Sequence, residues 1–319
     1  MSKFNLITFI KEMVELSPRQ FEGETRARNL IVKILGDNQV PYMLQTFHID
    51  LPRTQRVWLK ADNELLECDG CSMVGGKIDN KEEIISSLAS ISEDRKEANI
   101  NFNPKCPDIS NVEYHFLPAI SVNHKSLKKI LKAKIVEGEL KVSKEKHKTA
   151  NILAGNTKDP EHICFAHYDS IKKGAIDNAS GVAVVMSVIF KKPETLKNTL
   201  YVFSACEELS YDQPVYWGYG FRKFEKKYYN ILDKAKKIFI IDSVGHSQTN
   251  IIKDTETIKE GFPIKNLEKW SKKIYFLAGD LDKLMTVYHS DMDDGRYIKQ
   301  KRLQETEEKL INQISKKTH

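Results

Sequence analysis

From Thr149 onward, short apolar runs alternate with longer segments of helical periodicity, and this alternation limits the folds open to the chain. We expect helices at Ser180–Phe190, Gly220–Lys236 and Gly295–Ser315. Strands that alternate with helices predict an α/β sheet covered on both faces. The predicted fold class is therefore α/β, with a mixed, mostly parallel central sheet. The expected strands have the near-continuous apolar character of strands buried on both faces: Ala150–Leu153, His162–His167, Thr199–Ser204, Lys237–Ile241 and Ile274–Ala278.

The first 145 residues have a different organisation. Two helices are expected at Ser2–Leu16 and Glu22–Gly36, where the glycine is a typical C-terminal signal. Strand-like segments follow at Tyr42–Ile49 and Val57–Ala61, and a hairpin is expected around Glu137-Gly138. We therefore divide the chain into opening elements at 1–61, a smaller β-rich insert at 62–145 and a third part at 146–319.

Composition excludes several classes of protein. Hydrophobic residues make up 40% and charged residues 29% of the 319 residues, which is typical of a globular protein with a sizeable core. The formal charge of +6 comes from basic residues scattered among acidic ones, so no nucleic-acid partner is expected. No signal peptide and no apolar run of membrane-spanning length is apparent. We expect a cytoplasmic protein with no membrane partner, and oligomeric state is left open.

The chain has five cysteines, an odd number that argues against a disulfide framework. Cys68-Asp-Gly-Cys71 has the spacing of half a zinc knuckle, but a structural zinc site normally needs a second pair. Two reduced thiols in a turn are the preferred reading. Cys164 and Cys206 have mostly apolar neighbours and are expected to be buried, inert thiols.

Ionisable residues follow the predicted central strands. In an open α/β sheet, ligands bind outside the carboxyl ends of the strands. Residues that follow different strands should therefore meet at one edge of the sheet. The residues concerned are His167, Asp169, Asp177, Glu207, Glu208, Asp242 and, after the last strand, His289.

Such a cluster of carboxylates would repel itself, and some members would be protonated near neutral pH. A divalent cation removes this problem because it supplies the missing positive charge. Mixed histidine and carboxylate ligands suit zinc, cobalt or manganese better than calcium. Two ions that share a carboxylate and a water are a common hydrolytic arrangement.

Structural roles remain open for single residues. Asp177 or Ser180 also fits the N-cap of the following helix, and His167 fits a satisfied core histidine. Asp242 also fits a turn or helix cap. His246, which directly follows Val244-Gly245, competes with His289 as the last ligand.

Five segments contain these residues, in the order Ala166-His-Tyr-Asp-Ser170, Gly174-Ala-Ile-Asp-Asn-Ala-Ser-Gly181, Ser204-Ala-Cys-Glu-Glu-Leu209, Ile241-Asp-Ser-Val-Gly245 and Tyr288-His-Ser-Asp-Met-Asp293. This set of motifs resembles peptidase family M28, a family of zinc metallopeptidases that are mostly aminopeptidases. The resemblance covers Thr149 to about Tyr297. The opening Ser17-Pro-Arg…Gly23-Glu-Thr also fits the family's usual start, and the insert at 62–145 is similar to its variable or protease-associated-like insertions. The position of the insert between the opening helices and the catalytic part also suggests a lid.

The resemblance implies a zinc aminopeptidase-like fold and a role for each residue. Asp177 would bridge two divalent metal ions, most readily Zn²⁺, with Co²⁺ or Mn²⁺ as alternatives. His167 and Asp242 would complete one metal site, and Glu208 and His289 the other. Glu207 would be the general base. Asp169 would accept the second N–H of His167 and fix its tautomer.

The expected function is a two-zinc aminopeptidase that removes N-terminal residues from a peptide substrate through a water held by the metals. Substrate-binding residues are unknown. One alternative is a carboxypeptidase, which would need a basic residue such as Arg222 or Arg296 to hold a free carboxylate. Another is a glutaminyl cyclase-like enzyme, although cyclase-like relatives tend to depart from Asp177-Asn-Ala-Ser-Gly181. A third is a non-catalytic binding protein that kept the fold.

Overall fold

The protein was analysed as a computed structural model, which describes residues 4–79, 83–89, 97–213 and 215–315. Its chain forms two compact units. Unit 1 comprises Met1–His48, Lys148–Leu281 and Asp293–His319, and unit 2 comprises Ile49–His147 and Asp282–Met292. Their boundaries differ from the predicted division at 61 and 145, because two long strands run from one unit into the other.

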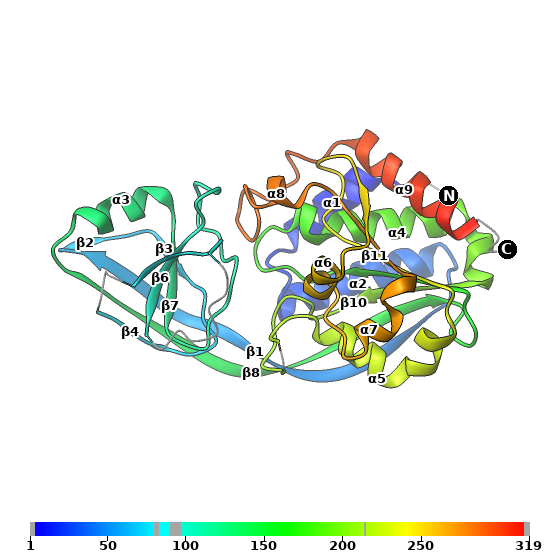
Figure 1. The fold of residues 1–319 in the computed structure, drawn as a ribbon, viewed down its shortest axis with the longest axis horizontal. Coiled ribbons are helices and arrows are strands. Elements are labelled where there is room, and N and C mark those ends of the chain that lie inside the picture. Colours follow the sequence, from blue (N-terminus) through cyan, green and yellow to red (C-terminus); the bar gives the residue numbers. More distant parts are fainter. Residues whose placement is uncertain (1–3, 80–82, 90–96, 214, 316–319) are drawn as a thin grey trace. The chain divides into compact units, whose positions relative to one another are not determined.

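The core of unit 1 is a mixed, mostly parallel sheet, as predicted (Figure 1). Its strands lie in the order β12-β13-β11-β9-β10-β8-β1. The four central strands, β9, β10, β11 and β13, pair in parallel, whereas β8 and β12 are antiparallel to their neighbours β10 and β13. The strands span β1 (Tyr42–Ala61), β8 (Val136–Gly155), β9 (His162–His167), β10 (Thr199–Ser204), β11 (Lys237–Ile241), β12 (Asn250–Ile252) and β13 (Ile274–Ala278).

Helices cover both faces of this sheet, which confirms the predicted fold class. On one face, α4 packs against β9 and against α1 and α9. The helices of unit 1 are α1 (Leu6–Glu15), α2 (Glu22–Asp37), α4 (Ser180–Lys191), α5 (Tyr219–Lys234), α6 (Thr255–Gly261), α7 (Leu267–Trp270) and α9 (Gln300–Ser315), with the short turns η1 (Ala175–Ala179), η2 (Pro193–Lys197) and η3 (Ser271–Lys273). The four-residue α8 (Leu281–Leu284) begins at the last residue of the Lys148–Leu281 segment.

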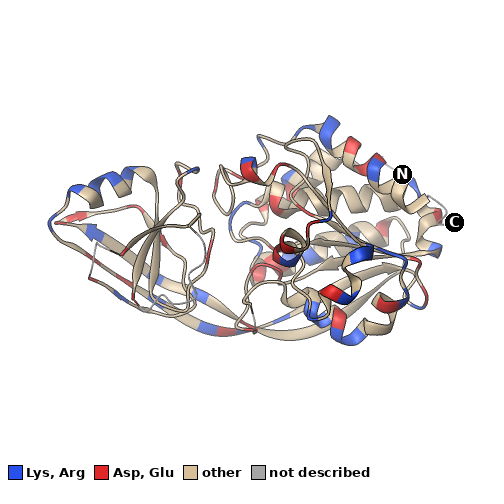
Figure 2. Cartoon of the chain, viewed as in Figure 1, with Lys and Arg blue, Asp and Glu red and all other residues tan. Residues whose placement is uncertain are grey.

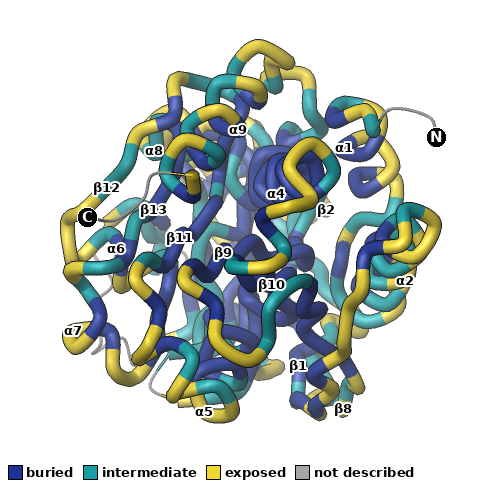
Figure 3. Tube along the Cα trace, turned by 90° about the vertical axis from the view of Figure 1, so that its right-hand side faces the viewer, coloured by how far each residue is buried: buried dark blue, intermediate teal, exposed yellow. Residues whose placement is uncertain are grey.

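Helix α4 is the most enclosed helix of unit 1 (Figure 3). The sequence predicts one buried face, with Val182, Val185, Met186 and Ile189. All ten residues from Ser180 to Ile189 are buried. The helix is enclosed because β9 lies on one side of it and α1 and α9 lie on the other.

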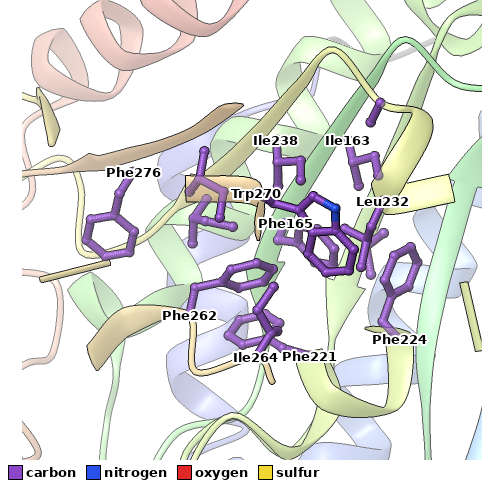
Figure 4. Packing of buried hydrophobic residues seen from close by; sticks show 14 of the residues in the cluster. Ile163, Phe165, Phe221, Phe224, Leu232, Ile238, Phe262, Ile264, Trp270 and Phe276 are labelled. Atoms are coloured by element: carbon purple, nitrogen blue, oxygen red, sulfur yellow. The ribbon is translucent and has the colours of Figure 1, made fainter. Parts of the chain in front are cut away.

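The opposite face of the sheet is held by an aromatic cluster (Figure 4). Phe165 of β9 lies at its centre, with ring centroids 5.0 Å from Phe224, 5.0 Å from Phe262 and 5.7 Å from Phe221. Each such ring buries a large apolar surface, and edge-to-face pairs add to the burial. The cluster joins β9 to α5 and the end of α6, and so fixes the strand that carries His167.

Unit 2 has a smaller sheet of its own, with the order β3-β7-β6-β5. One helix, α3 (His124–Lys132), buries Ile130 in an aliphatic core that includes Leu59, Ile120 and Leu140. The unit is β-rich, and its strands are β2 (Glu64–Leu65), β3 (Cys68–Gly70), β4 (Gly76–Ile78), β5 (Ile84–Ser86), β6 (Asn99–Phe102), β7 (Ala119–Val122) and parts of β1 and β8.

Several predicted boundaries are wrong. The strand expected at Ala150–Leu153 is part of the longer β8, and α2 continues past Gly36 to Asp37. The strands expected at Tyr42–Ile49 and Val57–Ala61 are one continuous strand, β1. No hairpin forms at Glu137-Gly138, which lie within β8. A Cβ on Gly138 would lie 2.7 Å from Leu59 Cδ1, so this glycine permits close packing of strands rather than a turn.

The last helix, α9, starts at Gln300 and not at Gly295. Gly295 has a φ of 96°, which does not continue a helix. The Lys299 N–H donates to the carbonyl of Gly245 and not to a carbonyl of the preceding turn. The first helix is observed from Leu6. The prediction is wrong for Phe4 and Asn5, because Asn5 is the N-cap of this helix. The predicted start at Ser2 lies outside the described residues.

The cysteines are all free thiols. Cys68 begins β3, which pairs with β7, and among the described residues no candidate group of metal ligands includes a cysteine. Cys164 and Cys206 are buried, as predicted. Figure 2 shows basic and acidic residues interspersed, for example along α9. Within the described part of the chain, no helix is both long and apolar enough to cross a lipid bilayer.

Candidate metal centre

The carboxyl ends of three parallel strands in unit 1 meet at one edge of the sheet. In the register of β9 and β10, His167 lies beside Ser204. In the register of β9 and β11, Phe165 lies beside Ile240. The residues that follow these strands are therefore delivered to the same place, as the rule for open α/β sheets predicts.

Two sharp turns direct the chain at this edge. Cys206, just before Glu207, has a φ of 49°, and Ser243, just after Asp242, has a φ of 51°. A positive φ is uncommon for residues other than glycine, and such conformations concentrate at functional sites. Both turns lie next to residues that the sequence predicts for the site.

The predicted residues of unit 1 come together around the imidazole of His167. His167 Nε2 lies 3.0 Å from Asp177 Oδ1 and 3.6 Å from Asp242 Oδ1. Ligand atoms of these three residues all lie within 4.8 Å of one another. The same holds for His167 with Glu207 and Glu208. Four carboxylates therefore lie close to the imidazole ring of His167.

Asp169 contacts both His167 and the backbone that carries Glu207 and Glu208. Its Oδ1 lies 3.5 Å from His167 Nδ1, whereas Asp177 and Asp242 face the other ring nitrogen, Nε2. The same carboxylate accepts the backbone N–H of Glu207 and of Glu208, each at 3.0 Å. A single buried side chain therefore positions both the end of β9 and the turn that follows β10.

Asp177 is presented by the irregular turn η1, before α4. Its side chain is only 6% exposed. Next to it, the Asn178 amide donates to the carbonyl of Ile241 at 2.9 Å and accepts the Gly181 N–H at 3.0 Å. The Ser180 hydroxyl accepts the Val244 N–H at 3.3 Å. These contacts attach the start of α4 to the end of β11, so that Asp177 and Asp242 stay together.

Charge in this cluster is strongly unbalanced. Burial by itself lowers the pKa of His167, but the carboxylates of Asp242, Asp169 and Asp177 outweigh it and raise that pKa well above its ordinary value. Burial, with the nearby charges of Glu208 and Asp169, raises the pKa of Glu207 well above its ordinary value, against the opposing effect of His167. A divalent cation would relieve both effects, because it supplies positive charge where carboxylates are crowded.

The residues present fit a zinc-type ion. The donors are one imidazole nitrogen and several carboxylate oxygens, and zinc binds both. His167, Asp177 and Glu208 are at most 5% exposed, and the Asp242 side chain is 13% exposed. Asp169 behind His167 is the outer partner that ligating histidines normally have.

His289, the remaining predicted ligand, belongs to unit 2. Its Nδ1 lies 2.9 Å from the carbonyl oxygen of Asn111. A carbonyl only accepts, so the neutral ring is protonated at Nδ1 and keeps its lone pair on Nε2, as a metal ligand requires. The competitor His246 lies in unit 1 and has its Nε2 3.0 Å from the Asp280 carbonyl.

Two further residues at this edge were not predicted as site residues. Arg19 is fully buried and donates to the carbonyls of Tyr168, Lys173 and Gly174. Asp293 is also buried and accepts the N–H of Ile176. Burial lowers the pKa of Arg19 to about 10 and raises the pKa of Asp293 to about 7. Both lie in quoted motifs, Ser17-Pro-Arg19 and Tyr288–Asp293, which were the only signals for them.

Comparisons with known proteins concern the family and the fold. Residues 149–272 match the model of peptidase family M28. The fold resembles BSAP, a zinc aminopeptidase from Bacillus subtilis, with a TM-score of 0.67 and 17% identity over 95% of this chain and 91% of that one. No match was found among curated proteins.

Two other solved structures share the fold. An aminopeptidase from Aneurinibacillus sp. strain AM-1 has a TM-score of 0.60 and 14% identity, over 96% of this chain and 92% of that one. A glutaminyl cyclase from Tannerella forsythia has a TM-score of 0.56 and 13% identity, over 99% of this chain and 100% of that one. The shared fold therefore includes both reaction types. The segment that is similar to peptidase family M28 holds six of the seven predicted site residues, all except His289.

Proposed function

We propose that this protein is a two-zinc aminopeptidase of peptidase family M28 that removes N-terminal residues from peptides. The observation that carries the proposal is the convergence of buried carboxylates on His167 at the carboxyl edge of the sheet. His167 and Asp242 would hold one ion, Glu208 and His289 the other, and Asp177 would be shared. The assignment of His289 rests on the Tyr288–Asp293 motif.

Zinc, when bound, supplies Lewis acidity that polarises the scissile carbonyl and lowers the pKa of the attacking water. Within the protein, Glu207 would take a proton from that water and deliver it to the leaving amine. The backbone of Glu207 is held by Asp169 Oδ1, which places the base beside His167. Asp169 would also keep the His167 ring in the tautomer that offers Nε2 to the metal.

The carboxypeptidase alternative is disfavoured by the two arginines considered for it. Arg222 is buried and donates to Asp212 Oδ2 at 2.9 Å and to the Trp217 carbonyl at 2.6 Å. Arg296 is paired with Asp294 at 2.6 Å. Both guanidinium groups are already engaged, so neither offers a ready site for a substrate carboxylate.

The test is a mass-spectrometric digest of a mixed peptide pool with added zinc or cobalt. We expect stepwise loss of N-terminal residues with wild type. Glu207→Gln should lower kcat by roughly 10²–10⁴-fold, the usual contribution of general base catalysis, and leave zinc content unchanged.

Other products would redirect the proposal. Pyroglutamate formation would establish a cyclase on the same site, and loss of C-terminal residues would establish a carboxypeptidase. A pool left intact by wild type, with zinc bound, would contradict peptidase activity on these substrates and favour a binding role.

A further inference from the structure

We propose that Arg19 and Asp293 are positioning residues that clamp the segment 168–177 in the shape that metal binding requires. This inference rests on the proposed function, because it concerns the segment between His167 and Asp177. Neither residue is expected to touch a metal ion or a substrate. Their effect would be exerted through the backbone that carries the ligands.

Arg19 holds the first part of this segment. Its Nε donates to the Tyr168 carbonyl at 2.7 Å, and its Nη2 donates to the Gly174 carbonyl at 2.8 Å. Its Nη1 donates to the Lys173 carbonyl at 3.0 Å. One planar guanidinium thus bridges two points of the chain that are six residues apart. A rigid fork of five donors makes this possible, and a lysine ammonium has no equivalent geometry.

Asp293 holds the second part. Its two carboxylate oxygens accept the N–H of Ile176 at 2.8 Å and of Asp177 at 3.1 Å. Its backbone carbonyl accepts the N–H of Ala175 at 2.9 Å. The acidic residue therefore fixes the backbone of the predicted shared ligand, Asp177, directly.

Arg19 and Asp293 supply hydrogen-bond partners to a buried stretch of backbone that has no regular secondary structure. The segment between β9 and η1 has no regular hydrogen bonding, although residues 168–171 and 174–177 are buried. Buried backbone groups must find partners. Arg19 supplies donors for the carbonyls and Asp293 supplies acceptors for the N–H groups, so opposite charges hold opposite ends of the segment.

Gly174 shows how closely this arrangement is fitted. Its φ is 58°, and a Cβ there would lie 2.9 Å from Arg19 Nη2 and 2.4 Å from the Asp177 carbonyl. A side chain at this position would displace the guanidinium or the start of η1. The glycine is therefore part of the same arrangement.

A purely structural role is the competing explanation, because Arg19 also donates to the Ser17 hydroxyl at 3.1 Å and to the Met13 carbonyl at 3.4 Å. These contacts hold the turn after α1. In that case its loss would destabilise the fold without changing the affinity for metal. Metal affinity and local hydrogen exchange separate the two explanations.

The experiment compares wild type, Arg19→Lys, Arg19→Gln and Asp293→Asn. Zinc affinity is measured by competition with a fluorescent chelator, and amide exchange is followed in the zinc-free protein. The matched control is Glu307→Gln, which removes a buried carboxylate that bonds Ser187 and Lys191. We expect zinc affinity to fall about 10–100-fold in the Arg19 and Asp293 variants, as when outer partners of metal ligands are lost. Exchange should accelerate at Ile176 and Asp177, and the control should keep wild-type affinity.

Several outcomes would overturn the inference. If wild type bound zinc and both Arg19→Lys and Asp293→Asn bound it with the same affinity, the proposed positioning role would be refuted. The proposed function would not be affected by this result. If Arg19→Lys alone kept wild-type zinc affinity, the positive charge of Arg19 would be sufficient. The proposed bridging by the guanidinium donors would then be refuted. If Arg19→Gln did not fold, the milder Asp293→Asn would decide. If wild type bound no zinc, the proposed function would fall as well.

Discussion

The carboxylate of Asp169 accepts a hydrogen bond from the backbone N–H of Glu207 at 3.0 Å, and so joins the turn after β10 to the end of β9. A second hydrogen bond reaches the N–H of Glu208. Asp169 is therefore more than a partner for His167. It places the predicted base and one predicted ligand relative to that histidine.

Asp169→Asn should lower both zinc affinity and kcat, by roughly 10–100-fold. An asparagine keeps the size of the side chain but presents an NH₂ group to one of the two N–H donors, which loses its acceptor. Asp254→Asn is the matched control, since Asp254 accepts the N–H of Thr257 at the start of α6, away from the site. Equal zinc affinity and kcat in wild type and Asp169→Asn would refute the positioning role.

Metal removal should destabilise the protein. The crowded carboxylates repel one another without a cation, and a ligand that binds only the folded state stabilises it by about 2.7 kcal/mol at a hundredfold excess over Kd. We expect zinc to raise the Tm of the chelator-treated protein by several degrees.

Asp177→Asn should abolish this rise in Tm. Asp159→Asn should keep it, because Asp159 is exposed on a surface loop and its carboxylate accepts a hydrogen bond from Asn156 of the same loop. Scanning fluorimetry with and without zinc measures both. A zinc-dependent rise that survives in Asp177→Asn would exclude this residue as a ligand.

His289 and His246 provide a direct comparison of two candidate ligands. We expect His289→Ala to lose about one equivalent of zinc by elemental analysis, relative to wild type. His246→Ala should retain full zinc content, since the His246 ring is held by the Asp280 carbonyl. The reverse pattern would show that the last ligand was assigned to the wrong histidine.

The thiols should differ in reactivity. Cys68 is partly exposed, and burial together with Asp69 raises its pKa to about 11. At neutral pH its thiolate fraction is therefore small. As long as the pH is below that pKa, this fraction increases about tenfold for each unit by which the pH is raised. The other four cysteines are buried.

Iodoacetamide labelling of the native protein, read by peptide mass spectrometry, should modify Cys68 first and faster at higher pH. Fast labelling of Cys206 at neutral pH would contradict the expectation, because burial raises the pKa of that thiol well above its ordinary value. Denatured protein, in which all five cysteines should react, is the control.

The amino-acid sequence alone determined the central strands and the residues that follow them. β9, β10, β11 and β13 have the predicted bounds. The physical reason is local: a strand buried on both faces must be continuously apolar, and the first ionisable residue marks its end. The same local pattern identified His167, Asp177, Glu207, Glu208 and Asp242, which the structure brings together in unit 1.

Tertiary structure decided what depends on contacts between distant segments. β1 and β8 are long because they pair with several strands, and Gly138 is in β8 because Leu59 packs against it, which no local pattern reveals. Arg19 lies 149 residues before Tyr168, whose carbonyl it binds. A buried arginine or aspartate is satisfied by whichever polar groups the fold brings within reach, so its role is set by the folded chain and not by its neighbours in sequence.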